Sequence, residues 1–119
     1  MNTTNTYAET FRAKARTAAE TWSEAARRET ANAKDKAEAN QPWAAREHAR
    51  EAAKAAWLTE LAATAAGDER SANLARAAKE YAETATEAAE RAEAQDRWNE
   101  GTMLLQALHD EAAKATRNQ

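Results

Sequence analysis

The sequence predicts an all-α protein, and its composition carries this prediction. Alanine supplies 36 of the 119 residues, and Glu, Arg and Lys, which also favour helices, are abundant. Val and Ile, from which strands are normally built, do not occur at all. We therefore expect a single domain over residues 1–119: an antiparallel up-down-up bundle of three long alanine-rich helices plus a short C-terminal amphipathic helix.

Three residues interrupt the helical pattern, and they set the predicted boundaries. Proline is favoured in the first turn of a helix and glycine just past its end. Pro42 therefore begins a helix, and Gly67 ends one, with Asp68 as the N-cap of the next. Together with Gly101, these residues predict helices near 6–39, 42–66, 68–99 and 102–116.

The apolar stripes on these helices consist mainly of alanine, so we expect the helices to lie close together. The stripe of the first helix is Tyr7, Phe11, Ala15, Ala18, Trp22, Ala26, Ala33 and Ala37. The second helix is apolar on two sides, which suits a central position between two neighbours. We expect Trp22 and Trp57 inside the bundle, and we expect Tyr7 and Phe11 to join Trp57, with Leu58, Leu61 and Leu74, at one of its ends.

The large aliphatic residues bunch in one place, just after Gly101. We expect Gly101 to break the chain, so that the helix near 102–116 folds back beside Trp43 and Trp98. The alternative is a helix that continues through Gly101. In that case Ala94, Trp98, Leu105 and Leu108 form a second stripe that needs another chain to cover it.

The chain lacks the residue patterns of the common enzyme and metal sites. It has no cysteine, too few glycines for a phosphate-binding loop, and only two histidines, His48 and His109. Alanine walls should leave little room for a pocket. We therefore expect no catalysis, cofactor, metal or small-molecule substrate. Without a signal sequence or an apolar run of about 20 residues, the cytoplasm is the expected location and no membrane partner is expected.

These features favour a non-enzymatic interaction module that acts through helix-face contacts, by self-association or by binding a protein partner. The residues we predict to contact the partner are Trp43, Trp98, Met103, Leu104, Leu105 and Leu108. One alternative is a nucleic-acid-associated accessory protein that uses the basic residues of the first helix, although acidic residues interleave with them. Another is a small inhibitor or regulator encoded by a phage or plasmid, which the Ala/Arg/Glu/Thr bias would suit.

A row of glutamates on the third predicted helix allows two interpretations. The members, spaced three or four residues apart, are Glu80, Glu83, Glu87 and Glu90. This spacing puts all four carboxylates on one helix face. We interpret the row as a solvated outer face, and the alternative is an acidic ridge that docks a basic partner.

Overall fold

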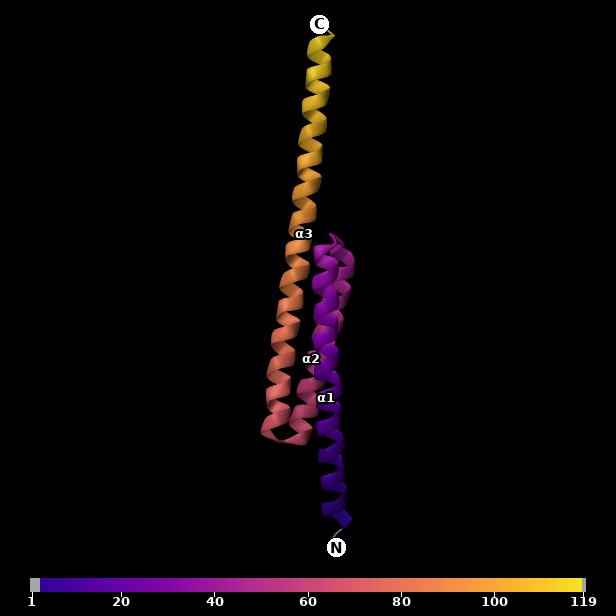
Figure 1. The fold of residues 1–119 in the computed structure, drawn as a ribbon, viewed down its shortest axis with the longest axis vertical. Coiled ribbons are helices and arrows are strands. Elements are labelled where there is room, and N and C mark those ends of the chain that lie inside the picture. Colours follow the sequence, from indigo (N-terminus) through magenta and orange to yellow (C-terminus); the bar gives the residue numbers. More distant parts are fainter. Residues whose placement is uncertain (1–2, 119) are drawn as a thin grey trace.

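The computed structural model describes residues 3–118, and this part of the chain contains three helices and no strand. They are α1 (Thr3–Glu38), α2 (Pro42–Ala66) and α3 (Glu69–Arg117). The chain reverses direction after α1 and again after α2, so the helices lie side by side in a rod that measures 97 × 17 × 16 Å (Figure 1). The all-α prediction is confirmed.

The two turns are formed by the residues that the sequence singled out. Pro42 stands in the first turn of α2, and the preceding turn holds Asn40 at a positive φ of 58°. Gly67 takes the left-handed conformation (φ 71°) and its N–H donates to the Ala63 carbonyl. The carboxylate of Asp68 then accepts the backbone N–H of Ser71 at 2.7 Å. The bounds predicted for α2 match, and α1 begins three residues before the predicted start at 6.

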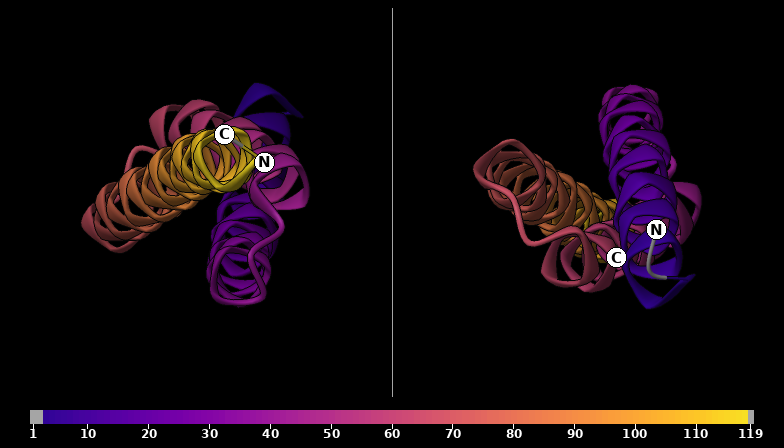
Figure 2. Two further views of the ribbon diagram at one scale, coloured as in Figure 1. Left: turned by 90° about the horizontal axis from the view of Figure 1, so that it is seen from above. Right: turned by 90° about the horizontal axis from the view of Figure 1, so that it is seen from below.

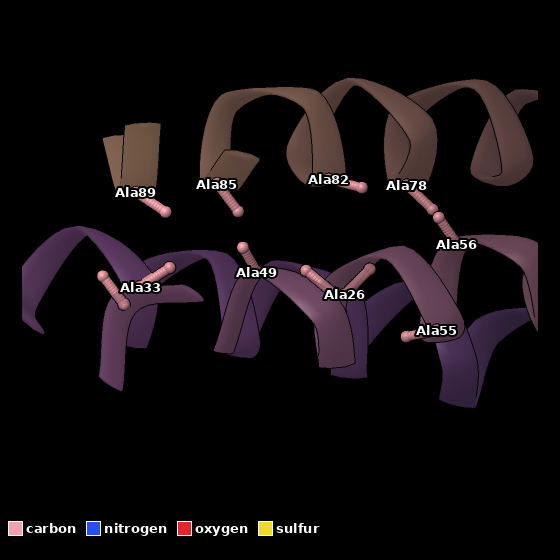
Figure 3. Packing of buried hydrophobic residues seen from close by; sticks show 11 residues of the cluster. Ala26, Ala33, Ala49, Ala55, Ala56, Ala78, Ala82, Ala85 and Ala89 are labelled. Atoms are coloured by element: carbon pink, nitrogen blue, oxygen red, sulfur yellow. The ribbon is translucent and has the colours of Figure 1, made fainter. Parts of the chain in front are cut away.

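The core of the protein is made of alanine methyl groups from all three helices. They point toward one another between α3 on one side and α1 and α2 on the other (Figure 3). The cluster comprises Ala26, Ala33, Ala45, Ala49, Ala52, Ala55, Ala56, Ala78, Ala82, Ala85 and Ala89. Side chains of this size let helix backbones approach closely, which explains how so slender a rod can still bury its centre.

The prediction that Trp22 and Trp57 lie inside is wrong. They are 37 % and 59 % exposed, because the narrow space between the packed alanines has no volume for an indole. Small hydroxyl residues fill the buried positions instead, and Thr59 is fully buried. Its hydroxyl donates to the carbonyl of Ala55 at 2.8 Å, so burying it leaves no unpaired donor.

The expected gathering of Tyr7 and Phe11 with Trp57 is also wrong. Arg16 of α1 lies 3.5 Å from Asp68, which places Arg16 level with the turn between α2 and α3. The start of α1 therefore extends past this turn (Figure 1). There Tyr7 and Phe11 stack on each other, with ring centroids 6.3 Å apart, outside the three-helix body.

The predicted break at Gly101 and the separate helix near 102–116 are wrong as well. Those residues are the last part of α3, which runs without interruption to Arg117. A glycine inside a helix costs only about 1 kcal/mol relative to alanine, and the good helix formers on both sides outweigh this cost. Thr102, which could have capped a new helix, instead donates its hydroxyl back to the Trp98 carbonyl at 2.9 Å.

Candidate interaction surface on the α3 extension

The last half of α3 leaves the body of the protein. Glu93 is its last residue that is not exposed, and the carboxylate of Glu93 pairs with Arg46 of α2. Every residue from Ala94 to Arg117 is exposed, and we call this segment the α3 extension. At 1.5 Å per residue it is about 36 Å long. It projects as a lone helix beyond the ends of α1 and α2 (Figure 1).

The length of α2 explains where the extension begins. α2 has 25 residues and α3 has 49, and the two helices run in opposite directions from the turn at 67–68. α2 can therefore accompany only about the first 25 residues of α3, since both helices rise equally per residue. α1 ends at the same end of the body, beside the start of α2. Figure 2, which looks along the rod, shows the C-terminal end of α3 standing over the middle of the molecule.

Five of the six predicted partner-binding residues lie on this extension. Their exposed fractions run from 51 % to 72 %, and they are Trp98, Met103, Leu104, Leu105 and Leu108. Trp43, the sixth, is in the first turn of α2, on the body, and it is also exposed. The extension therefore carries these large residues away from Trp43, and the expected cap over that end of the body is not formed.

One row of small and apolar residues on the extension follows a seven-residue repeat. Alternate steps of four and three residues connect Ala94, Trp98, Gly101, Leu105, Leu108, Ala112 and Ala115. We call this row the seam. A row with this spacing forms one narrow stripe along a helix and is typical of two helices that supercoil around each other. Gly101 occupies one position of this repeat, although in the sequence it stood out only as a point where the helix could break.

The seam faces away from the body. At 100° per residue it lies about 150° around α3 from the face that carries the buried Ala78, Ala85 and Ala89. It shares its side of α3 with the glutamate row, all of whose members are exposed. This row, Glu80, Glu83, Glu87 and Glu90, is called the acidic ridge below. A second helix could therefore lie along the seam beyond the ends of α1 and α2. At one end it would approach the acidic ridge, where Glu83, Glu87 and Glu90 line a groove beside α2.

Charged and polar residues border the seam. Arg97, Leu104 and Glu111 lie along one edge of it, and Thr102 and His109 lie along the other. On the far side of the helix, polar side chains are already paired within the extension. Gln95 donates to Asn99 and Gln106 donates to Asp110, each at 3.0 Å. The seam is thus the longest apolar stripe of the extension, with Leu104 at its edge and Met103 on the far side of the helix.

The body carries a groove that was not predicted from the sequence. An open groove of about 750 Å³ runs between α2 and α3, with Trp57, Ala56 and Ala82 among the residues that line it. The expectation that alanine walls leave little room for a pocket is therefore wrong. The signal was present in the sequence, because Trp57 lies on the side of α2 opposite its alanine face.

The two histidines lie apart. Nδ1 of His48 is 2.7 Å from a carboxylate oxygen of Glu29 in the body, whereas His109 is on the extension. Among residues 3–118 no group of three His, Cys, Asp or Glu side chains is arranged to hold a metal ion. None of the helices in this range is both long and apolar enough to cross a membrane.

The basic residues of α1 do not form a continuous basic face. Arg16 lies near Asp68, and Arg27 donates to Glu24. Glu20 of the same helix lies 3.3 Å from Arg70 of α3. Because acidic partners interleave with the cations, no observation here favours binding to nucleic acid.

Comparison with known protein families, with curated proteins and with solved structures finds no match to this chain.

Proposed function

We propose that this chain is a non-enzymatic interaction module, and that its α3 extension pairs through the seam with a helix of another polypeptide. The observation that carries the proposal is a seven-residue apolar repeat on a lone helix about 36 Å long, none of which the body covers. The three packed helices would then serve as an up-down-up platform that holds the extension in place.

The physical argument is the free energy of burial. Trp98, Leu105 and Leu108 are each more than half exposed, and burying a side chain of this kind is worth about 2 kcal/mol or more. Most of the stability of a helix in a protein comes from packing of its apolar face, and no part of this chain packs against the extension. Pairing along the seam would remove the apolar surface from water and stabilise the extension at the same time. A second copy of the chain is the first partner to consider, since any solution of the protein contains it.

The test is the mass of the full chain in solution, measured by light scattering across a range of concentrations. We expect a mass above the 13.0 kDa of one chain. The double variant Leu105→Glu with Leu108→Glu should return the mass to that of one chain, because it places carboxylates in the seam. Circular dichroism should show that the helices of the body remain folded.

A matched control separates the seam from added charge. Met103→Glu with Ala107→Glu introduces the same two charges on the extension but outside the seam. This control should keep the mass of the unmodified chain. Equal masses for the unmodified chain and the seam variant would contradict the proposed function.

A further inference from the structure

We infer that the seam is covered by the seam of a second copy of this chain, and that the two extensions run antiparallel about a twofold axis at Met103. The inference rests on the proposed function and specifies its partner, orientation and register. Four observations support it: the sizes of the seam residues, the charges beside the seam, the position of the acidic ridge and the direction in which the seam faces.

The seam residues match in size when the extensions are centred on Met103. In this register Trp98 lies opposite the second copy's Leu108, and Gly101 lies opposite the second copy's Leu105. Ala94 and the second copy's Ala112 form the outermost layer. Apart from its chain neighbours and the adjoining helix backbone, no described atom lies within 4 Å of the position that a Cβ on Gly101 would occupy, so the space beside Gly101 is open to a leucine. Trp98 and Leu108 thus pack against each other across the pair, each Leu105 meets a glycine, and the two tryptophans do not meet each other.

The charges at the edge of the seam also match. Arg97 and Glu111 lie on the same edge, six residues before and eight residues after Met103. The antiparallel register therefore puts Arg97 beside the second copy's Glu111, and the symmetry repeats this pair. Moving the twofold axis by half a repeat along the helix would instead place Glu111 beside the second copy's Leu104, which gives no ion pair.

A parallel pair lacks these contacts. It would place the two bodies side by side with the acidic ridges facing each other, so that like charges would repel. It would also put Trp98 opposite Trp98 and leave Arg97 without an acidic partner across the seam. In the antiparallel pair the bodies lie at opposite ends, and the seam faces away from both of them.

The overall length of the pair distinguishes the two orientations. One chain is 97 Å long, and Met103 lies about 21 Å from the end of α3. The antiparallel pair is therefore about 150 Å long, whereas a parallel pair stays near the length of one chain. Small-angle scattering of the full chain, with its mass determined on the same sample, should give a dimer with a maximum dimension of about 150 Å. A dimer near 100 Å long would overturn the orientation.

A charge exchange tests the register. Arg97→Glu and Glu111→Arg should each weaken dimerisation by about tenfold, because each puts like charges together at two symmetric places. The double variant restores both pairs and should bring the dissociation constant back to within about threefold of the unmodified chain. Glu100→Arg, on the extension but away from the seam, is the control and should change the constant little.

The outcomes separate this inference from the proposed function. If the Leu105→Glu, Leu108→Glu variant dissociates the dimer but the charge exchange does not restore binding, the seam is the contact and the register is wrong. If that variant leaves the mass unchanged, the seam is not the contact and both proposals fail.

Discussion

The hydroxyl oxygen of Thr30 in α1 lies 2.9 Å from the carbonyl oxygen of Tyr81 in α3. The same hydroxyl is 2.8 Å from the Ala26 carbonyl of its own helix, so its single hydrogen is shared between the two acceptors. Thr30 is buried. A side chain this short reaches the backbone of another helix only because the alanines around it hold the two helices close together.

Replacing Thr30 with valine should lower the free energy of unfolding by about 1 kcal/mol. Valine keeps the shape of threonine but cannot donate to the Tyr81 carbonyl, and a typical intramolecular hydrogen bond contributes about this much. Chemical denaturation monitored by circular dichroism measures the change. Thr64→Val is the control, because Thr64 is exposed and bonds only to Glu60 of its own helix. Equal effects at the two positions would show that the bond between helices adds nothing.

Enlarging a core alanine should be costly. Ala85 is fully buried in the alanine cluster, so Ala85→Leu must push α3 away from its neighbours. Overpacking of this kind costs about 1–3 kcal/mol, and a body with so little room to rearrange should lie at the upper end of that range. Ala107→Leu, on the exposed extension outside the seam, should be tolerated. Similar unfolding midpoints for the two variants would contradict the close approach of the helices.

Replacing the two glycines with alanine, one at a time, should change the stability of the protein in opposite directions. Gly67 has a positive φ of 71°, so Gly67→Ala places a Cβ in a strained conformation and should destabilise the body by about 1 kcal/mol. Gly101 is inside a helix with open space around it, so Gly101→Ala should stabilise the α3 extension by about 1 kcal/mol. Hydrogen exchange of backbone amides, at concentrations where the chain is monomeric, measures both changes in stability. Slower exchange after Gly67→Ala would contradict the assigned cap.

The cap of α3 should make stability depend on pH. The Ser71 backbone N–H donated to Asp68, with Arg16 nearby, holds the pKa of this carboxyl below its usual range. A carboxyl with a lowered pKa in the folded state stabilises the protein above its unfolded pKa, and the contribution is lost as the pH falls through the folded value. The contribution of Asp68 should therefore disappear below about pH 4.

Asp68→Asn isolates this effect. Asparagine can still cap the helix but does not titrate, and all other carboxyls are common to both proteins. The difference in melting temperature between the unmodified chain and the variant should be largest near neutral pH and should shrink as the pH is lowered to about 3. A difference that does not change with pH would show that ionisation of Asp68 plays no part.

Some elements could be predicted from local sequence because their cause is local. Pro42 and the Gly67–Asp68 pair act on the few residues beside them, so both turns were located correctly. The alanine face of α2 was also predicted, since Ala45, Ala49 and Ala52 are buried as expected. Gly101 and Gly67 are the same residue type, but Gly67 ends a helix and Gly101 lies inside one. Whether a glycine ends a helix depends on the total stability of the helix around it, which no single residue reveals.

The residues proposed to bind a partner were singled out in the sequence, but their placement was not predicted. Trp98, Leu105 and Leu108 were chosen because they are large and apolar, and their exposure agrees with that choice. Their separation from the body follows from the unequal lengths of α2 and α3, which are known only once α3 is known to be continuous.

The sequence by itself determined that this protein consists of helices, where two of its turns lie and that its core is alanine, because propensity, capping and side-chain volume are properties of residues and their near neighbours. Only the tertiary structure decided which faces meet. The spacing between the helices turned Trp22 and Trp57 outward and drew Thr30 against Tyr81. The unequal lengths of α2 and α3 left the end of α3 without a neighbour, since a helix can be covered only along the length that its partners share with it.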